Sequence, residues 1–138
     1  MTYEEILVGQ YASFTKTITE TDVYSFAGIT GDFNPIHINR VYAQGTRFGK
    51  PIVHGMLISS LFSTVFCMKL PGEGAIYISQ DINFKAPVFI DDTITATVTV
   101  LEKSEKGRVL FKCTAFNQDD RIVVDGSAVL IPLKNDAI

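Results

Sequence analysis

The sequence predicts a single α+β domain, residues 1–138, in which a curved antiparallel sheet wraps around one long apolar helix. Two observations lead to this prediction. The stretch 55–68 contains no charged residue, and from residue 75 onward apolar and polar residues alternate. The chain has 138 residues with 46% apolar content, which is enough for one domain with a buried core.

The beginning of the chain predicts one strand and one helix. Residues 12–18 alternate well enough for a first strand. A helix is expected over 19–32, because Thr19 is a suitable N-cap and Asp22 follows three positions later. We expect Gly31 to end this helix, since glycine readily adopts the backbone conformation found at helix ends.

Two more helices are expected before the strands. Residues 39–44 predict a short helix with Asn39 as its N-cap. The apolar stretch 55–68 predicts a helix that is buried on nearly every side and is stopped by the pair Pro71-Gly72. It is shorter than the about 20 apolar residues of a membrane span, so no membrane partner is expected. It also carries hydroxyl groups at Ser59, Ser60, Ser63 and Thr64.

Four long strands are expected in the second half of the chain. They cover residues 75–85, 92–103, 108–118 and 121–133. In "TITATVTV" the threonines share one face, and the other face carries Ile94, Ala96, Val98 and Val100. Turn residues over 102–107 and 117–120 favour antiparallel pairing between successive strands. Such a sheet, curved around a central helix, is the arrangement called a hot-dog fold.

Charge and cysteine usage exclude several classes of function. The net charge is −3 and Lys and Arg form no block, which argues against nucleic acid and against an anionic membrane surface as partners. Glu4 and Glu5 stand where a signal peptide would be basic. Cys67 and Cys113 lie far apart in apolar contexts, so both are expected to be free thiols that fill the core in a reducing cytoplasm.

The segment "GDFNPIHIN", residues 31–39, brings an acid and a potential base close together beside a proline. Pro35 fixes its own φ and pushes Asn34 toward an extended conformation, so the loop is constrained. Asp32 and His37 project from this loop. The segment is either an ordinary turn with an incidental histidine or a catalytic pair, and the local pattern alone favours the turn.

A second segment of interest begins the apolar helix. The N–H of Gly55 lacks an intrahelical partner and lies at the positive end of the helix dipole, which suits a developing oxyanion. Gly55, Ser59 and Ser63 form a polar stripe at i, i+4 and i+8. The alternative is that the serines bond to carbonyls one turn earlier. His54 is expected to have a structural role, such as a helix cap.

Neither a metal nor another cofactor is expected. His37 and His54 are the only histidines, and they lie seventeen positions apart without the spacing of metal ligands. The sequence also contains no glycine-rich phosphate loop and no GxSxG motif, so nucleotide hydrolysis and a serine-hydrolase triad lack support.

Together the two segments, "GITGDFNPIHINRVYAQGTRFGKPIVHGMLISSLFSTV", resemble the MaoC-like (R)-specific enoyl-CoA hydratases. That family combines a Gly-Asp-x-Asn-Pro-hydrophobic-His loop with a Val-His-Gly-Met helix start. The strand region "AIYISQDINFKAPVFIDD" also has a counterpart there, so the resemblance covers nearly the whole chain. It implies a homodimeric hot-dog protein that adds water to trans-2-enoyl-CoA and forms (R)-3-hydroxyacyl-CoA.

The resemblance also implies roles for individual residues. Asp32 and His37 match the catalytic pair of the family, and Asn34 supports their loop. The N–H of Gly55 would polarise the thioester carbonyl, and Ser63 matches a position near the substrate. From charge and proximity in sequence, the CoA phosphates are expected near the cations Arg40, Arg47, Lys50 or Lys85.

Two other functions are consistent with the predicted fold. A hot-dog acyl-CoA thioesterase commonly carries a carboxylate on the central helix, and FabZ-type acyl-carrier-protein dehydratases pair their histidine with an acid there. No Asp or Glu lies between residues 37 and 73, so both fit poorly. The remaining alternative is a non-catalytic module that binds acyl thioesters.

Overall fold

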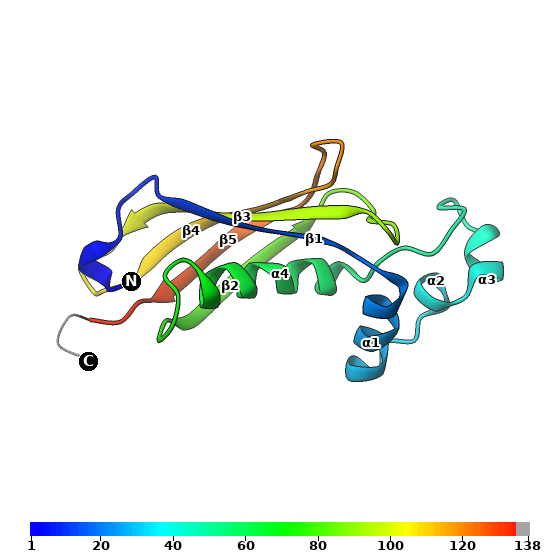
Figure 1. Ribbon diagram of the computed structural model, residues 1–138, viewed down its shortest axis with the longest axis horizontal. Helices are drawn as coiled ribbons and strands as arrows, with labels where there is room; N and C mark the ends of the chain where they lie inside the picture. The colour runs from blue at the N-terminus through cyan, green and yellow to red at the C-terminus, as the bar shows by residue number, and fades with distance from the viewer. Residues whose placement is uncertain (135–138) are drawn as a thin grey trace.

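The computed structural model describes residues 1–134 as one antiparallel sheet packed against helices (Figure 1). The last four residues of the predicted domain 1–138 lie outside the described part. The helical elements are a short 3-10 turn at Tyr3–Glu5, α1 (Glu20–Thr30), α2 (Pro35–Ile38), α3 (Arg40–Gln44) and α4 (Gly55–Met68). The strands are β1 (Tyr11–Thr17), β2 (Ile76–Phe84), β3 (Thr93–Lys103), β4 (Val109–Phe116) and β5 (Ile122–Ile131).

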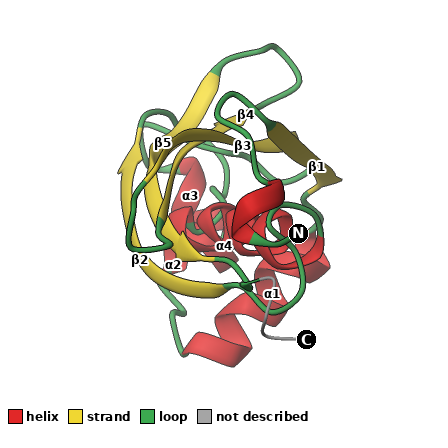
Figure 2. Cartoon of the chain, turned by 90° about the vertical axis from the view of Figure 1, so that its left-hand side faces the viewer, coloured by secondary structure: helices red, strands yellow, loops and turns green. Residues whose placement is uncertain are grey.

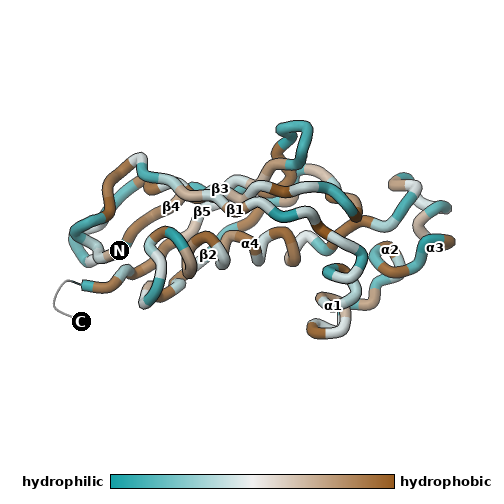
Figure 3. The backbone as a smooth tube through the Cα atoms, viewed as in Figure 1, coloured by the Kyte–Doolittle hydropathy of each residue, from teal (hydrophilic) through white to brown (hydrophobic). Residues whose placement is uncertain are grey.

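The sheet has the strand order β1-β3-β4-β5-β2, and every neighbouring pair is antiparallel. The expected pairing of successive strands is confirmed for β3, β4 and β5, whose connecting turns are hydrophilic (Figure 3). It is wrong for β2 and β3. After β2 the chain crosses over, so β2 pairs with β5 and becomes an edge of the sheet. The sheet curves around α4, as Figure 2 shows.

Helix α4 supplies much of the core through the side that faces the sheet. The buried residues of this helix are Ile58, Ser59, Leu61, Phe62, Val65 and Phe66. The prediction of burial on nearly every side is wrong, because Met56 is 58% exposed and Met68 is 76% exposed. The sheet covers only one side of the helix within a single chain. For the same reason Cys67 is exposed rather than part of the core, whereas Cys113 is buried as predicted.

The face of the sheet that points away from α4 carries the predicted threonines of β3. Their hydroxyls pair with hydroxyls of β1 across the strands, at 2.7 Å for Ser13–Thr97, 2.9 Å for Thr15–Thr95 and 2.8 Å for Thr17–Thr93. The alternate residues of β3, from Ile94 to Val100, are buried against the helix. The period-two pattern of this strand is therefore confirmed on both faces.

The end of α1 determines where the following loop starts. Thr19 caps the helix by accepting from the Asp22 N–H at 3.1 Å, and the Asp22 carboxylate accepts from the Thr19 N–H at 2.9 Å. Gly31 ends the helix in the left-handed conformation, with φ 80°. Among the described residues, no helix is both long and apolar enough to cross a membrane.

Candidate active site

The loop after α1 is built from short-range side-chain bonds. The Thr30 hydroxyl accepts from the Asp32 N–H at 3.2 Å, and the Asp32 carboxylate accepts from the Asn34 N–H at 3.3 Å. The Asn34 side chain accepts from the Ile36 N–H at 3.2 Å and so caps α2. Locally the segment is the Asx-type turn that its residues favour.

The sequence predicts a loop up to residue 38, whereas the structure forms the single-turn helix α2 at its end. Pro35 occupies its first turn, where the missing N–H costs nothing and the fixed φ suits a helix. This single turn carries His37, whose Nδ1 lies 2.7 Å from the carbonyl oxygen of Ile52. A carbonyl only accepts hydrogen bonds, so Nδ1 carries the proton and Nε2 of the neutral ring is left as an acceptor.

His54 connects the start of α4 to this loop. It occupies the N-cap position, but its side chain makes no capping hydrogen bond, so the prediction that it acts as a cap is wrong. Its Nε2 instead lies 3.0 Å from the main-chain oxygen of Asp32. Its ring stacks on His37 with centroids 3.9 Å apart and planes at 25°. The ring of His54 faces the loop, where the Asp32 carbonyl accepts its hydrogen bond and the His37 ring provides a stacking surface.

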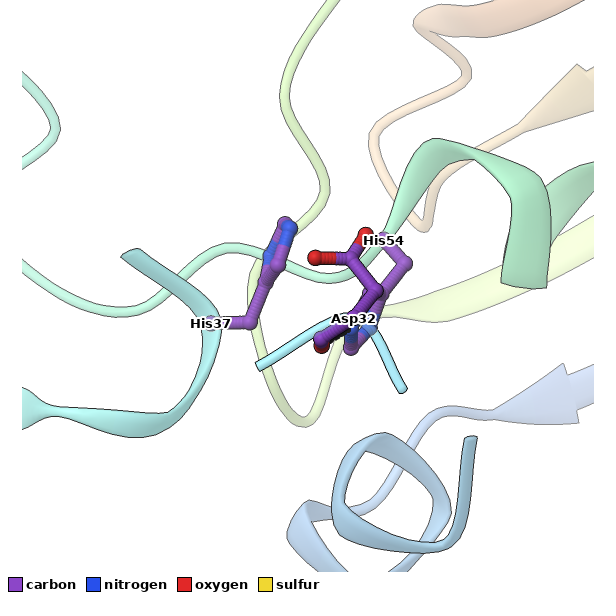
Figure 4. A group of neighbouring side chains, drawn as sticks. All are labelled: Asp32, His37 and His54. Atoms are coloured by element: carbon purple, nitrogen blue, oxygen red, sulfur yellow. Dashed lines mark hydrogen bonds between the residues drawn. The ribbon is translucent and has the colours of Figure 1, made fainter. Parts of the chain in front are cut away.

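Asp32, His37 and Gly55 converge on one cavity of about 470 Å³. Figure 4 shows the Asp32 carboxylate and the His37 ring, which come from separate parts of the 31–38 segment, close to each other and to His54. The rest of the cavity is mainly apolar and includes Met56, Ile58, Phe84, Ala86, Val88 and Val124. Its cationic lining residues are Arg47 and Lys85.

The ring of Phe84 packs directly against Gly55. A Cβ at this position would lie 2.5 Å from Cε1 of Phe84, which is closer than two carbon atoms can approach. The start of α4, at Gly55 and Met56, lines the cavity, and the first N–H groups of a helix have no intrahelical partners. This arrangement can stabilise negative charge on an oxygen bound in the cavity.

The pKa of His37 lies below its ordinary value. Burial of the ring is the main cause, and the nearby His54 adds to the effect. The hydrogen bond to Ile52 and the charge of Asp32 act in the opposite direction without cancelling the shift. The ring is therefore neutral near pH 7, with Nε2 free to accept a proton.

The three polar side chains also meet a simple distance criterion for a metal site. One carboxylate oxygen of Asp32 and one ring nitrogen each of His37 and His54 lie within 4.8 Å of one another. The two imidazole rings are stacked with planes at only 25°, so their lone pairs lie in two nearly parallel planes. Two histidines that bind one zinc ion each direct a ring-nitrogen lone pair at it from about 2.0–2.1 Å. Stacked rings do not converge in this way, so the arrangement does not fit a shared zinc ion.

Two predicted site residues, Ser63 and Asn34, do not line the cavity. Ser63 is half-buried in the middle of α4, with its hydroxyl 3.9 Å from Cys67 Sγ. Asn34 is exposed and caps α2 instead. The alternative interpretation of the serines is right for Ser59, which donates to the carbonyl of Gly55 at 3.0 Å. Four contacts of the site escaped sequence reasoning. They are the bond of His54 to Asp32, the stacking of His54 on His37, the bond of His37 to Ile52 and the packing of Phe84 on Gly55. The only sequence signal for the first was the position of His54 directly before the helix.

Comparisons with known proteins agree on one family. Residues 7–117 match the model of the MaoC like domain. An (R)-specific enoyl-CoA hydratase from Rhodospirillum rubrum is 48% identical over 96% of this chain and 92% of its own length. A 3-hydroxybutyryl-CoA dehydratase from Methylorubrum extorquens is 42% identical over 98% of this chain and 87% of its own length. The solved structure of an R-hydratase from Pseudomonas aeruginosa superposes with a TM-score of 0.94 at 40% identity, over 97% of this chain and 86% of that one.

Proposed function

The chain belongs to the MaoC-like family, and we propose on this basis that it adds water reversibly to trans-2-enoyl-CoA to give (R)-3-hydroxyacyl-CoA. The observation that carries the proposal is the convergence of Asp32, His37 and the start of α4 on one mainly apolar cavity. The reaction needs two proton-handling groups, a site for negative charge and an apolar space for the acyl chain. The cavity provides all of these.

The distance between the two side chains suits one water molecule. One carboxylate oxygen of Asp32 and one ring nitrogen of His37 lie no more than 4.8 Å apart. Two hydrogen bonds of about 2.8 Å that meet at a tetrahedral angle span about 4.6 Å. A water between Asp32 and His37 would accordingly bond to both, and its oxygen would face the substrate from one side only.

The addition then proceeds with balanced protons. The water oxygen bonds to the β-carbon, and the electrons of the double bond move toward the thioester carbonyl. Asp32 and His37 together remove one proton from the water and deliver one to the α-carbon. The N–H groups at Gly55 hold the negative charge that forms on the carbonyl oxygen. Asn34 keeps the loop in place through its cap of α2.

The direct test is hydration of crotonyl-CoA and longer homologues, followed by loss of enoyl absorbance and by chiral analysis of the product. We expect a product that is almost entirely (R), because the water is held on one face. A product that is mainly (S), or racemic at early times, would reject the assigned site. Release of free CoA thiol without hydration would instead support an acyl-CoA thioesterase. Such an enzyme commonly carries a carboxylate on the central helix, whereas Asp32, on the loop, is the only acid among the described residues that line the cavity.

The CoA phosphates are proposed to contact Arg47 and Lys85, the cations that line the cavity. The other two expected cations, Arg40 and Lys50, line a second, smaller cavity that contains neither Asp32 nor His37, and Arg40 pairs there with Glu20. Arg47→Gln combined with Lys85→Gln should raise KM for crotonyl-CoA and leave KM for crotonyl-pantetheine, which lacks the nucleotide phosphates, unchanged. An equal increase for both substrates would remove these residues from the phosphate site.

A homodimer is proposed from the edge strand β2. Its outward side has no neighbouring strand in the described chain, and it exposes large apolar side chains. Ile76 and Phe84 are each 58% exposed, and Ile78 is 41% exposed. Proteins normally protect or pair such an edge, and a second copy of the chain would also cover the open side of α4 near Met56. Light scattering that finds a fully active monomer at micromolar concentration would contradict the dimer.

A further inference from the structure

His54 is a buried ionisable side chain that the proposed reaction does not use. Only 2% of it is exposed, and it lies between the loop and α4. Three contacts surround the ring. Its Nε2 is 3.0 Å from the main-chain oxygen of Asp32, its face stacks on His37 at 3.9 Å, and Phe26 meets it edge-on at 5.0 Å. One side chain therefore touches both residues of the catalytic pair.

The hydrogen-bond partner determines which tautomer of His54 is present. The Asp32 carbonyl can only accept, so Nε2 of His54 carries the proton. The other nitrogen, Nδ1, is buried and has no hydrogen-bond partner among residues 1–134. A buried polar atom without a partner lowers stability. An apolar residue would fill this place at less cost, so packing alone does not account for an imidazole here.

We propose that His54 is a positioning residue, which holds the main chain of Asp32 with its Nε2–H and supports the ring of His37 with its face. This role rests on the proposed hydration reaction. Asp32 itself is exposed, and its own loop offers only short-range turn bonds. The bond from His54 spans 22 positions of sequence and ties the loop to the rigid start of α4. It thereby sets the separation between the two groups that hold the water.

Three variants separate the two contacts of the ring. His54→Gln keeps an N–H that can reach the Asp32 carbonyl but loses the aromatic face. His54→Phe keeps the face but loses the donor, and His54→Ala loses both. We expect kcat to fall by roughly 10- to 100-fold in His54→Ala, the scale of a small misplacement of reacting groups, while KM changes little. The Gln and Phe variants should each recover part of the loss.

Val65→Ala is the matched control. Val65 is fully buried in α4, the helix that His54 precedes, and does not line the cavity. Its truncation should lower the melting temperature while kcat per folded molecule stays at the wild-type value. If His54→Ala behaves in the same way, with normal kcat per folded molecule, His54 is merely a core residue and the proposal is overturned.

Nuclear magnetic resonance provides a readout that does not depend on turnover. The chain contains two histidines, so long-range ¹⁵N–¹H spectra of an untagged protein resolve both rings. We expect the Nε2–H tautomer for His54 and the Nδ1–H tautomer for His37 near pH 7.5. An active wild type in which His54 carries its proton on Nδ1 would overturn the positioning role alone. A wild type that hydrates no enoyl-CoA would overturn the proposed function, and the role of His54 with it.

Discussion

The segment 31–38 and the pair formed by α4 and the sheet are stabilised in different ways. The core side of α4 is held by apolar burial, and Phe62 and Val65 are completely inaccessible to solvent. No residue of the segment 31–38 is buried. It is held by turn bonds within itself and by three hydrogen bonds to the stretch before α4. These join His37 to the Ile52 carbonyl, the Ile52 N–H to the Ile36 carbonyl, and His54 to the Asp32 carbonyl. Stability and chemistry are thus located in different parts of one small domain, and substitutions should affect them separately.

The largest expected effect comes from the catalytic pair. Asp32→Asn keeps the shape of the side chain and removes its charge, and His37→Ala removes the other proton-handling group. Each should lower kcat by roughly 10²–10⁴-fold, the scale of a lost general acid or base, with little change in melting temperature. The double variant should lose much less than the product of both effects, because both groups act on one water.

Asp119→Asn, in the exposed turn between β4 and β5, is the control for the change of charge. It should leave both turnover and melting temperature unchanged. A folded Asp32→Asn protein with near-normal turnover would mean that the segment 31–38 is only a turn.

Phe62→Ala tests the core between α4 and the sheet, where we expect an effect on stability and not on turnover. Truncation of a fully buried phenylalanine leaves a cavity in the core and should reduce the free energy of unfolding by about 3–5 kcal/mol. Because Phe62 does not line the cavity of the site, kcat per folded molecule should stay close to wild type. Guanidinium unfolding at constant protein concentration, measured beside the hydration rate, checks both statements. A loss of turnover without a loss of stability would contradict the conclusion that stability and chemistry are located in different parts of the domain.

Gly55→Ala acts where the two regions meet. The new Cβ would be placed 2.5 Å from the Phe84 ring, which has to swing away and change the cavity. We expect kcat/KM to fall by roughly 10²-fold, since small displacements near the reacting atoms are costly. Gly28→Ala in α1 is the matched control, because nothing lies within 4 Å of its added Cβ. If both variants retain wild-type kcat/KM, the open start of α4 has no part in the reaction.

The smallest expected effect is a shift of pH dependence. Burial lowers the pKa of His37, so its neutral form persists to more acidic pH than that of a free histidine, which titrates near about 6.5. The acid limb of kcat/KM should accordingly lie below that value. The charge of Asp32 opposes the shift, so the titration of His37 in Asp32→Asn, followed by ¹⁵N resonance, should move lower still. A midpoint above that of free histidine in the wild type would contradict the buried, neutral ring.

The parts of the site that the sequence predicted are those with local signals. The acid and the base lie five positions apart around a proline, and Gly55 lies at the first residue of an apolar run. The contact of Phe84 with Gly55 has no such signal, because the two residues lie 29 positions apart on different elements. Ser63 shows the converse case. Its regular spacing from Gly55 on one helix suggested a shared site, yet two turns of helix carry it away from the cavity.

The sequence by itself determined the long helices, the strands and the chemistry available at the loop, but not the single-turn helix α2. The cap at Thr19, the end at Gly31 and the alternation of β3 depend on residues a few positions apart, and their physics is local. Only the tertiary structure decided that β2 crosses to the far edge, that one side of α4 stays open and that His54 stacks on His37. These features depend on which surfaces remain uncovered once the sheet has closed around the helix. Contacts between residues far apart in the sequence produce no regular spacing of residues from which they could be predicted.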